Sequence, residues 1–154
     1  MSKNLAITLI ILIAIPIVIF FFYKKNPPQF DSINIKIKDT DYKLEIAKSI
    51  SQKSTGLSNR TKLCSNCGMI FIFSQEGTLP FWMKDTLIPL DMIWLNSNGK
   101  VVDVKNVSKT NSLDIIQNST PAKYVIELNI GDAQKINLKT GDTIDLSRLN
   151  EIEK

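Results

Sequence analysis

Residues 5–23 form an unbroken apolar run, LAITLIILIAIPIVIFFFY, and no other feature constrains this 154-residue chain as strongly. A helix of about 20 such residues spans the hydrocarbon core of a bilayer. Aromatic residues and then Lys24 and Lys25 close the run, without the small-residue cleavage site of a secretory signal peptide. We therefore expect residues 1–25 to be an uncleaved transmembrane anchor that contacts the membrane through residues 5–23.

The charges beside this run are nearly balanced, with Lys3 and the terminal amine on one side and Lys24 and Lys25 on the other. The very short N-terminal tail favours an anchor whose N-terminus stays in the cytoplasm. We expect a single-pass protein of the cell membrane whose soluble part lies outside the cytoplasm. Residues 26–32 begin with Asn-Pro-Pro-Gln and are expected to be a stiff, extended spacer.

Composition excludes several classes of function. The chain has no histidine, which removes the commonest general base and the commonest metal ligand. No G-x-S-x-G motif occurs, and no histidine could activate a serine. The net charge of +4 comes from mixed signs without a dense basic stripe, so no nucleic acid partner is expected. No cofactor is expected either. These absences leave enzymatic activity open but favour a protein without it.

Residues 33–148 show the alternation and turn signals of a β-rich domain, and residues 149–154 are a short tail. Ile33, Ile35 and Ile37 alternate with polar residues and predict a strand that pairs with residues 42–47 as a hairpin. The other expected strands are residues 68–73, 79–84, 91–95, 100–107, 123–129 and 143–146. One or two short helices are expected, at residues 49–60 and 131–136. This pattern predicts a mainly β fold, a small antiparallel sandwich or barrel, and argues against a parallel nucleotide-binding sheet.

Two blocks in the middle of the chain are specific enough to indicate a family. They are Gly68-Met69-Ile70-Phe71-Ile72-Phe73 and Phe81-Trp82-Met83-Lys84-Asp85-Thr86-Leu87-Ile88-Pro89-Leu90-Asp91. Around them stand Glu45-Ile46-Ala47, Gly56-Leu57, Arg60, Gly99-Lys100-Val101-Val102, Tyr124-Val125-Ile126-Glu127-Leu128, Gly131 and Gly141-Asp142. In this order the chain resembles the domain of unknown function 192 family over nearly all of residues 33–146. The resemblance implies a small β-sandwich-like domain, often with an export signal or anchor, and no agreed activity.

Three positions depart from the pattern of that family. Asp85 stands where an asparagine is more usual, and Cys64 and Cys67 lie in a loop that does not usually carry a cysteine pair. Roles for these three residues therefore cannot be taken from the resemblance.

The Cys64-Ser65-Asn66-Cys67 motif is open to three interpretations. Outside the cytoplasm a local disulfide is the default, and it would stabilise little because its loop is so small. A redox-active pair would have to open a helix after a strand. A zinc site would need carboxylates or a second chain to complete its ligands. A variant of the metal interpretation is a Cu(I) site in which methionine sulfurs join the two cysteines, although methionines at strand positions are commonly core residues. The methionines of this soft-ligand set are Met69, Met83 and Met92.

The segment from Phe81 to Asp91 supplies the candidate ligand-binding face. Phe81 and Trp82 are adjacent, so on a strand one would enter the core and the other could line a groove. An aromatic platform beside a few polar groups suits a sugar-like or peptide ligand. The candidate ligand-binding residues are Arg60, Trp82, Lys84, Asp85, Thr86 and Asp91. In the alternative interpretation, Trp82 belongs to the core and Asp85 and Thr86 form a turn. The segment from Phe81 to Asp91 would then serve the fold and not a binding site.

The function that these observations favour is a membrane-anchored, extracytoplasmic β domain that binds an unidentified ligand or protein partner. One alternative is a hydrolase of saccharide-like substrates that uses Asp85 and Asp91 as paired carboxylates. Another is a soft-metal or redox module at the cysteine pair. Arg60 and Glu127 are lone charges in otherwise apolar or helical surroundings, so an ion pair between them, or an anion site at Arg60, is also conceivable.

Overall fold

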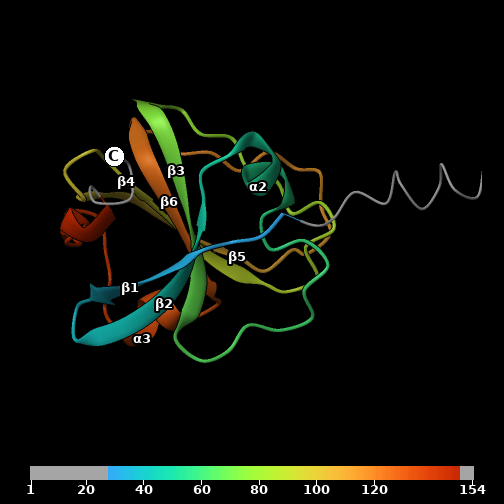
Figure 1. The fold of residues 1–154 in the computed structure, drawn as a ribbon, viewed down its shortest axis with the longest axis horizontal. Coiled ribbons are helices and arrows are strands. Elements are labelled where there is room, and N and C mark those ends of the chain that lie inside the picture. Colours follow the sequence, from blue (N-terminus) through green and yellow to red (C-terminus); the bar gives the residue numbers. More distant parts are fainter. Residues whose placement is uncertain (1–27, 150–154) are drawn as a thin grey trace, which may run out of the picture.

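The computed structural model describes residues 28–149, which form one six-stranded sheet with two short α-helices and a 3₁₀ turn (Figure 1). The elements in chain order are β1 (Ser32–Ile37), β2 (Thr40–Ala47), α2 (Ile50–Thr55), β3 (Cys67–Gly77), β4 (Leu90–Leu95), β5 (Val101–Val107), β6 (Ala122–Asn129), α3 (Asp132–Lys135) and η1 (Ser147–Leu149). The order across the sheet is β1-β2-β3-β6-β4-β5. The mainly β fold with short helices is thus confirmed.

The expected anchor falls on residues 1–25, outside the described range. Within residues 28–149, no helix combines the length and apolar character needed to cross a bilayer.

Both predicted hairpins are present. β1 pairs antiparallel with β2, with Ile35 opposite Tyr42, and β4 pairs antiparallel with β5. Gly99 closes the second hairpin with a φ of 73°, and a Cβ atom there would lie 2.2 Å from the carbonyl oxygen of Ile144. The turn therefore requires glycine for both its backbone conformation and its close contact.

One connection was not predicted: β2 and β3 are parallel, joined by a crossover that contains α2. The helix begins with a capping box, in which the Ser49 side chain accepts from the Gln52 backbone N–H and the Gln52 side chain accepts from the Ser49 backbone N–H. This crossover places α2 over one face of the sheet, where it forms one wall of the site described below.

Two expected strands are absent from the sheet. The segments at residues 79–84 and 143–146 make only isolated bridges, from Phe81 to Ile116 and from Thr143 to Lys100. In the first segment Pro80 has no N–H to donate to a ladder. Leu79 and Met83 are nevertheless buried, so the apolar pattern reflects side-chain packing rather than strand pairing.

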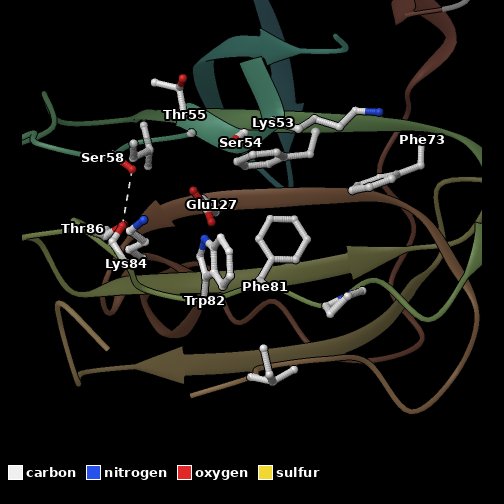
Figure 2. A pocket seen from close by; sticks show the side chains of 15 residues that line it. Lys53, Ser54, Thr55, Ser58, Phe73, Phe81, Trp82, Lys84, Thr86 and Glu127 are labelled. Atoms are coloured by element: carbon white, nitrogen blue, oxygen red, sulfur yellow. Dashed lines mark hydrogen bonds between the residues drawn. The ribbon is translucent and has the colours of Figure 1, made fainter. Parts of the chain in front are cut away.

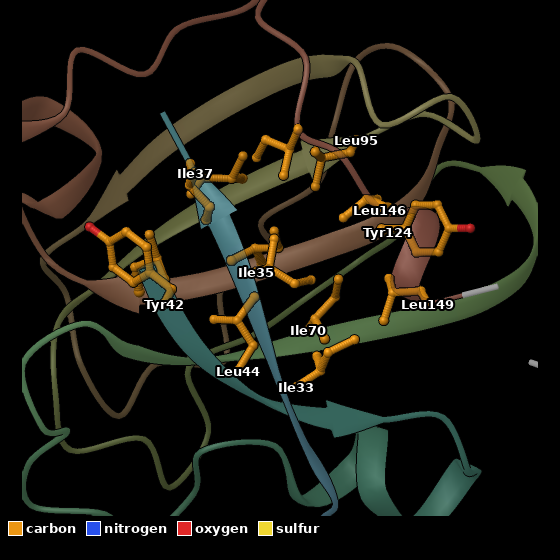
Figure 3. Close-up of a cluster of buried hydrophobic side chains, with 14 of the residues drawn as sticks. Ile33, Ile35, Ile37, Tyr42, Leu44, Ile70, Leu95, Tyr124, Leu146 and Leu149 are labelled. Atoms are coloured by element: carbon orange, nitrogen blue, oxygen red, sulfur yellow. The ribbon is translucent and has the colours of Figure 1, made fainter. Parts of the chain in front are cut away.

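The sheet has a hydrophobic core on each face. One contains the alternating isoleucines of β1 together with Ile70, Tyr124 and Leu146 (Figure 3). Ile37 at one edge of the sheet shares this core with Leu95 and Val101 near the other edge, so the single sheet curls around it. The opposite face carries the second core, which includes Met69, Phe71, Met83, Met92 and Trp94. The site lies on this second face.

Candidate functional site

A pocket of about 370 Å³ lies on the second face of the sheet, between α2 and the segment 80–86 (Figure 2). Its lining residues are Lys53, Ser54, Thr55, Gly56, Leu57, Ser58, Phe71, Phe73, Pro80, Phe81, Trp82, Lys84, Thr86, Ile115 and Glu127. They come from α2 and the turn after it, from β3, from β6 and from two loops. This volume suits a small organic ligand.

Aromatic side chains make up much of the wall. The Phe81 ring packs edge-to-face on Phe71, with centroids 5.0 Å apart, and on Phe73 and Trp94 at 6.3 Å. These contacts fix Phe81 against the core. Trp82, the next residue, keeps half of its surface exposed and lines the same pocket. A rigid inner ring and an accessible indole thus stand side by side.

Glu127 is the acidic residue of this pocket. In the sheet it is the register partner of Met69 on β3 and of Met92 on β4, so its side chain points to the same face as theirs. It is only 4% exposed, and Figure 2 shows its carboxyl group directed into the pocket. Among residues 28–149, no group forms a hydrogen bond or salt bridge with this carboxyl group.

Burial raises the pKa of Glu127 to about 8, and the positive charge of Arg60 only partly opposes this shift. The acid is therefore mostly protonated at neutral pH. In that form it can donate one hydrogen bond as well as accept others.

Arg60 does not contact this acid. Its guanidinium group forms a two-point ion pair with Glu45 on β2, at 2.6 and 2.7 Å, and this pairing raises the pKa of Arg60. The conceivable pair between Arg60 and Glu127 is thus replaced by one between Arg60 and Glu45. With its charge already paired, Arg60 influences the pocket only through its field at Glu127.

Two lysines line the pocket. The Lys53 ammonium group lies 4.4 Å from the centroid of the Phe73 ring, and its burial lowers its pKa. The backbone at Lys84 is held in place because its carbonyl oxygen accepts hydrogen bonds from the hydroxyl groups of Ser58 and Thr86. Within the described part of the chain, neither lysine has a carboxylate within ion-pair distance.

Besides Arg60, two further candidate residues, Asp85 and Asp91, do not line the pocket. Asp85 is exposed and has a φ of 56°, a left-handed conformation that asparagine and aspartate adopt more readily than other side chains. Its carbonyl oxygen accepts from the Asn59 N–H, and its own N–H donates to the Asn111 side chain. Asp85 therefore serves as a turn residue, and the asparagine usual in the family would fit the same conformation.

Asp91 lies on the opposite face of the sheet. It is the register partner of Leu128, one residue beyond Glu127, and successive strand residues point to opposite faces. It is fully buried, and its carboxylate accepts hydrogen bonds from the Asn106 amide group and from the Ala133 backbone N–H, at 2.8 Å for the latter. Both of its oxygens are satisfied inside the fold, so Asp91 fixes α3 against the sheet.

Of the six candidate residues, the structure thus gathers Trp82, Lys84 and Thr86 in one pocket and leaves Arg60, Asp85 and Asp91 outside its lining. The sequence patterns did not indicate the pocket residues that α2 and β3 add, above all Lys53 and Phe73, and they indicated Glu127 only as a lone charge and conceivable partner of Arg60. A signal for Glu127 existed, because it is the one charge in the apolar stretch Tyr-Val-Ile-Glu-Leu.

The cysteine pair lies outside the pocket. Cys64 and Cys67 form a disulfide, and the Asn129 side chain donates a hydrogen bond to the Cys64 carbonyl oxygen. Disulfide sulfurs are not the thiolates that zinc requires. The three methionines considered as soft ligands belong to the core. Across residues 28–149, no group of three or more acidic, cysteine or histidine side chains is placed to hold a metal ion.

Fold and site together define a small, single-sheet β domain with an apolar pocket that encloses an acid. Residues 33–146 match the model of the DUF192 family, described as an uncharacterized ACR, and the chain belongs to this family. The resemblance found in the sequence is thereby confirmed.

Two crystal structures are similar to this chain. One is from Sinorhizobium meliloti and is described as a candidate transcription regulator; it is 28% identical, with a TM-score of 0.69, and the match covers 76% of this chain and 93% of that one. The other is a protein of unknown function from Novosphingobium aromaticivorans, 25% identical, with a TM-score of 0.68 and coverage of 80% and 89%. No curated protein matches the chain.

Proposed function

We propose that this protein is a binding module that holds a small, largely apolar ligand with one polar group in the pocket between α2 and segment 80–86. Glu127 is the observation that carries this proposal. This side chain is almost fully removed from bulk solvent, lines the pocket and has no hydrogen-bond partner among residues 28–149. Most buried polar groups in folded proteins do have such a partner. The carboxyl group of Glu127 faces a pocket whose walls are aromatic, so a ligand that fills the pocket would complete its hydrogen bonding.

A hydrolase with paired carboxylates is less well supported. Glycoside hydrolysis by this route needs two carboxyl groups facing each other across the substrate. Among the described residues that line the pocket, Glu127 is the one carboxylic acid, since neither Asp85 nor Asp91 belongs to the lining. Binding alone accounts for the arrangement.

We further propose that residues 5–23 hold this domain at the outer face of the cell membrane. The length of the apolar run supports a single span. The disulfide of Cys64 and Cys67 supports an oxidising compartment. An alkaline phosphatase fused after Lys154 tests the orientation, because that enzyme needs its own disulfides: high activity in a bacterial host supports export, and activity no higher than a cytoplasmic control contradicts it.

Neutral aromatic fragments test the binding function. Indole, phenol and benzamide are added to the full chain in detergent micelles, and saturation-transfer NMR detects contact after subtraction of the signal from micelles alone. We expect a transfer signal that Trp82→Ala removes. Leu87→Ala is the matched control, because Leu87 lies in the same loop, is equally exposed at 50% and does not line the pocket. Equal signals in all three proteins, or no signal with any fragment, would contradict the proposal.

A further inference from the structure

We infer that the ligand of this pocket is a carboxylate on a small aromatic or otherwise apolar body, with Glu127 as hydrogen-bond donor to the carboxylate and Lys53 and Lys84 as the positive charges of the pocket. The inference rests on the proposed binding function and names the chemical class of its ligand.

The first step concerns Glu127. Because burial keeps this side chain mostly protonated at neutral pH, it offers a hydroxyl group to the pocket. Within residues 28–149 that hydroxyl has no acceptor. A ligand oxygen that accepts a hydrogen bond therefore suits this hydroxyl group, whereas a ligand ammonium group has no lone pair with which to accept it.

The second step concerns charge. With Glu127 neutral, the charged side chains lining the pocket are Lys53 and Lys84, and neither is paired with a carboxylate of the described chain. Other lysines are paired, as Lys38 is with Asp142 and Lys109 with Asp114, both at 2.7 Å or less. The Lys53 ammonium group lies against the Phe73 ring and, in Figure 2, is directed away from Glu127, so it contributes positive charge to the pocket rather than a contact beside the acid. A pocket that holds two such cations and a neutral acid is complementary to an anion.

The third step concerns the body of the ligand. Phe73, Phe81 and Trp82 present ring surfaces to the pocket, and Trp82 is exposed enough to cover a ligand from the solvent side. Flat or apolar groups fit such walls, and offset or edge-to-face aromatic contacts add to the burial of area. A ring system that carries a carboxylate would pack on the aromatic walls. Its carboxylate would be attracted by the two lysines and would accept the hydrogen bond of Glu127.

This arrangement fixes how affinity depends on pH. The ligand must be ionised, which a simple carboxylic acid is above about pH 5. Glu127 must keep its proton, which it does below about pH 8. The affinity for a carboxylate should thus be constant from pH 6 to 7 and fall about tenfold per pH unit above 8. A cationic ligand would show the reverse, with affinity rising as Glu127 ionises.

Three probes that differ only in their polar group test the inference: 3-phenylpropionate, 3-phenylpropanamide and 3-phenylpropylamine. Each is titrated by calorimetry into the full chain in detergent micelles at pH 6, 7, 9 and 10, with titration into empty micelles subtracted. We expect the carboxylate to bind at least tenfold more tightly than the amide and the amine to give no saturable heat. The affinity for the carboxylate should fall about a hundredfold from pH 7 to pH 10.

Variants separate the contributions of single residues. Glu127→Gln keeps an N–H donor but cannot ionise, so between pH 7 and 9 it should lose much less affinity for the carboxylate than the native protein does. Loss that remains toward pH 10 is assigned to Lys53, whose pKa burial lowers. Lys84→Met should weaken binding about tenfold, whereas Lys36→Met, which removes an exposed lysine on β1, should leave it unchanged. Both lysines are exposed, so neither change should impair folding.

Two results would overturn the inference. Tighter binding of the amine than of the carboxylate, strengthening toward pH 9, would mean that Glu127 acts as an anion toward a cationic ligand. Absence of saturable carboxylate binding at 10 mM would exclude the carboxylate class. In either case the proposed binding function is tested separately, by whether the neutral fragments contact Trp82.

Discussion

Glu45 and Glu127 lie in one row across the sheet, on the same face, with Met69 between them. Glu45 is held by both nitrogens of the Arg60 guanidinium group, whereas Glu127 has no such partner among residues 28–149. Since Arg60 is engaged by Glu45, desolvation decides the protonation of Glu127. Of the two glutamates in this row, one is held by an ion pair, and the other, Glu127, is mostly protonated at neutral pH and faces the pocket.

The raised pKa of Glu127 predicts how stability depends on pH. The folded protein keeps on this residue a proton that the unfolded chain releases near pH 4.5, and it releases that proton only near pH 8. Between these values the folded state binds more protons, so the free energy of unfolding falls as the pH rises and levels off above 8. The contribution of this group is roughly 5 kcal/mol across that window. Urea denaturation of the full chain at several pH values, followed by near-ultraviolet circular dichroism, measures it.

Glu127→Gln isolates that contribution. The amide has no proton to lose, so the variant should be more stable than the native protein at pH 7, by roughly 3 kcal/mol, and this difference should shrink toward pH 5. An equal loss of stability with rising pH in both proteins would assign the effect to other groups.

Asp91 should matter for folding and not for binding. Asp91→Ala leaves the Ala133 N–H and the Asn106 amide group without their buried acceptor, which should lower the free energy of unfolding by about 3 kcal/mol. Asp85→Asn is the comparison, because asparagine adopts the same left-handed backbone, and it should change stability by less than about 0.5 kcal/mol. If Asp91→Ala instead abolishes fragment binding at full stability, Asp91 belongs to the site after all.

Gly68 permits the close approach of β3 and β6 beneath the pocket. A Cβ atom at this position would lie 2.2 Å from the carbonyl oxygen of Glu127, a backbone atom that cannot move aside cheaply. Gly68→Ala should therefore cost about 3 kcal/mol. Gly77 lies in the same strand with open space around it, so Gly77→Ala should be nearly neutral. Equal denaturation midpoints for the two variants would disprove this explanation.

The disulfide should stabilise the domain modestly. It bridges cysteines only three positions apart, and closing so short a loop removes little entropy from the unfolded chain. Replacing Cys64 and Cys67 together by serine should lower the free energy of unfolding by about 2 kcal/mol and leave the affinity for neutral fragments unchanged. A loss of binding in a variant that still folds would connect the cysteine loop to the pocket.

Local patterns predicted much of the fold. The alternation in Ile33, Ile35 and Ile37 gave the right hairpin, and Ser49 marked the start of α2 correctly. The parallel pairing of β2 and β3 could not be predicted in this way, because alternation reports which residues are buried and not the direction of the neighbouring strand. The apolar run at residues 79–84 was misread as a strand because burial by packing leaves the same pattern.

The site was predicted only in part, for a geometric reason. Trp82 and Asp91 are close in sequence, but the chain turns between them and β4 presents Asp91 to the other face of the sheet. Glu127 is 45 positions after Trp82 and reaches the same pocket because β6 lies beside β3. Pairing of distant strands decides which side chains share a pocket, and single-sequence patterns do not contain that pairing.

The protonation of Glu127 tests the account most directly. Carboxyl carbon NMR of the full chain, labelled at glutamate side chains and titrated from pH 4 to 10, reports each acid separately, and Glu127→Gln identifies the resonance. We predict that the Glu127 carboxyl carbon titrates near pH 8 in the absence of ligand. A midpoint near 4.5, the ordinary value for glutamate, would mean that the acid is ionised and solvated, and would contradict both the neutral donor and the pocket built around it.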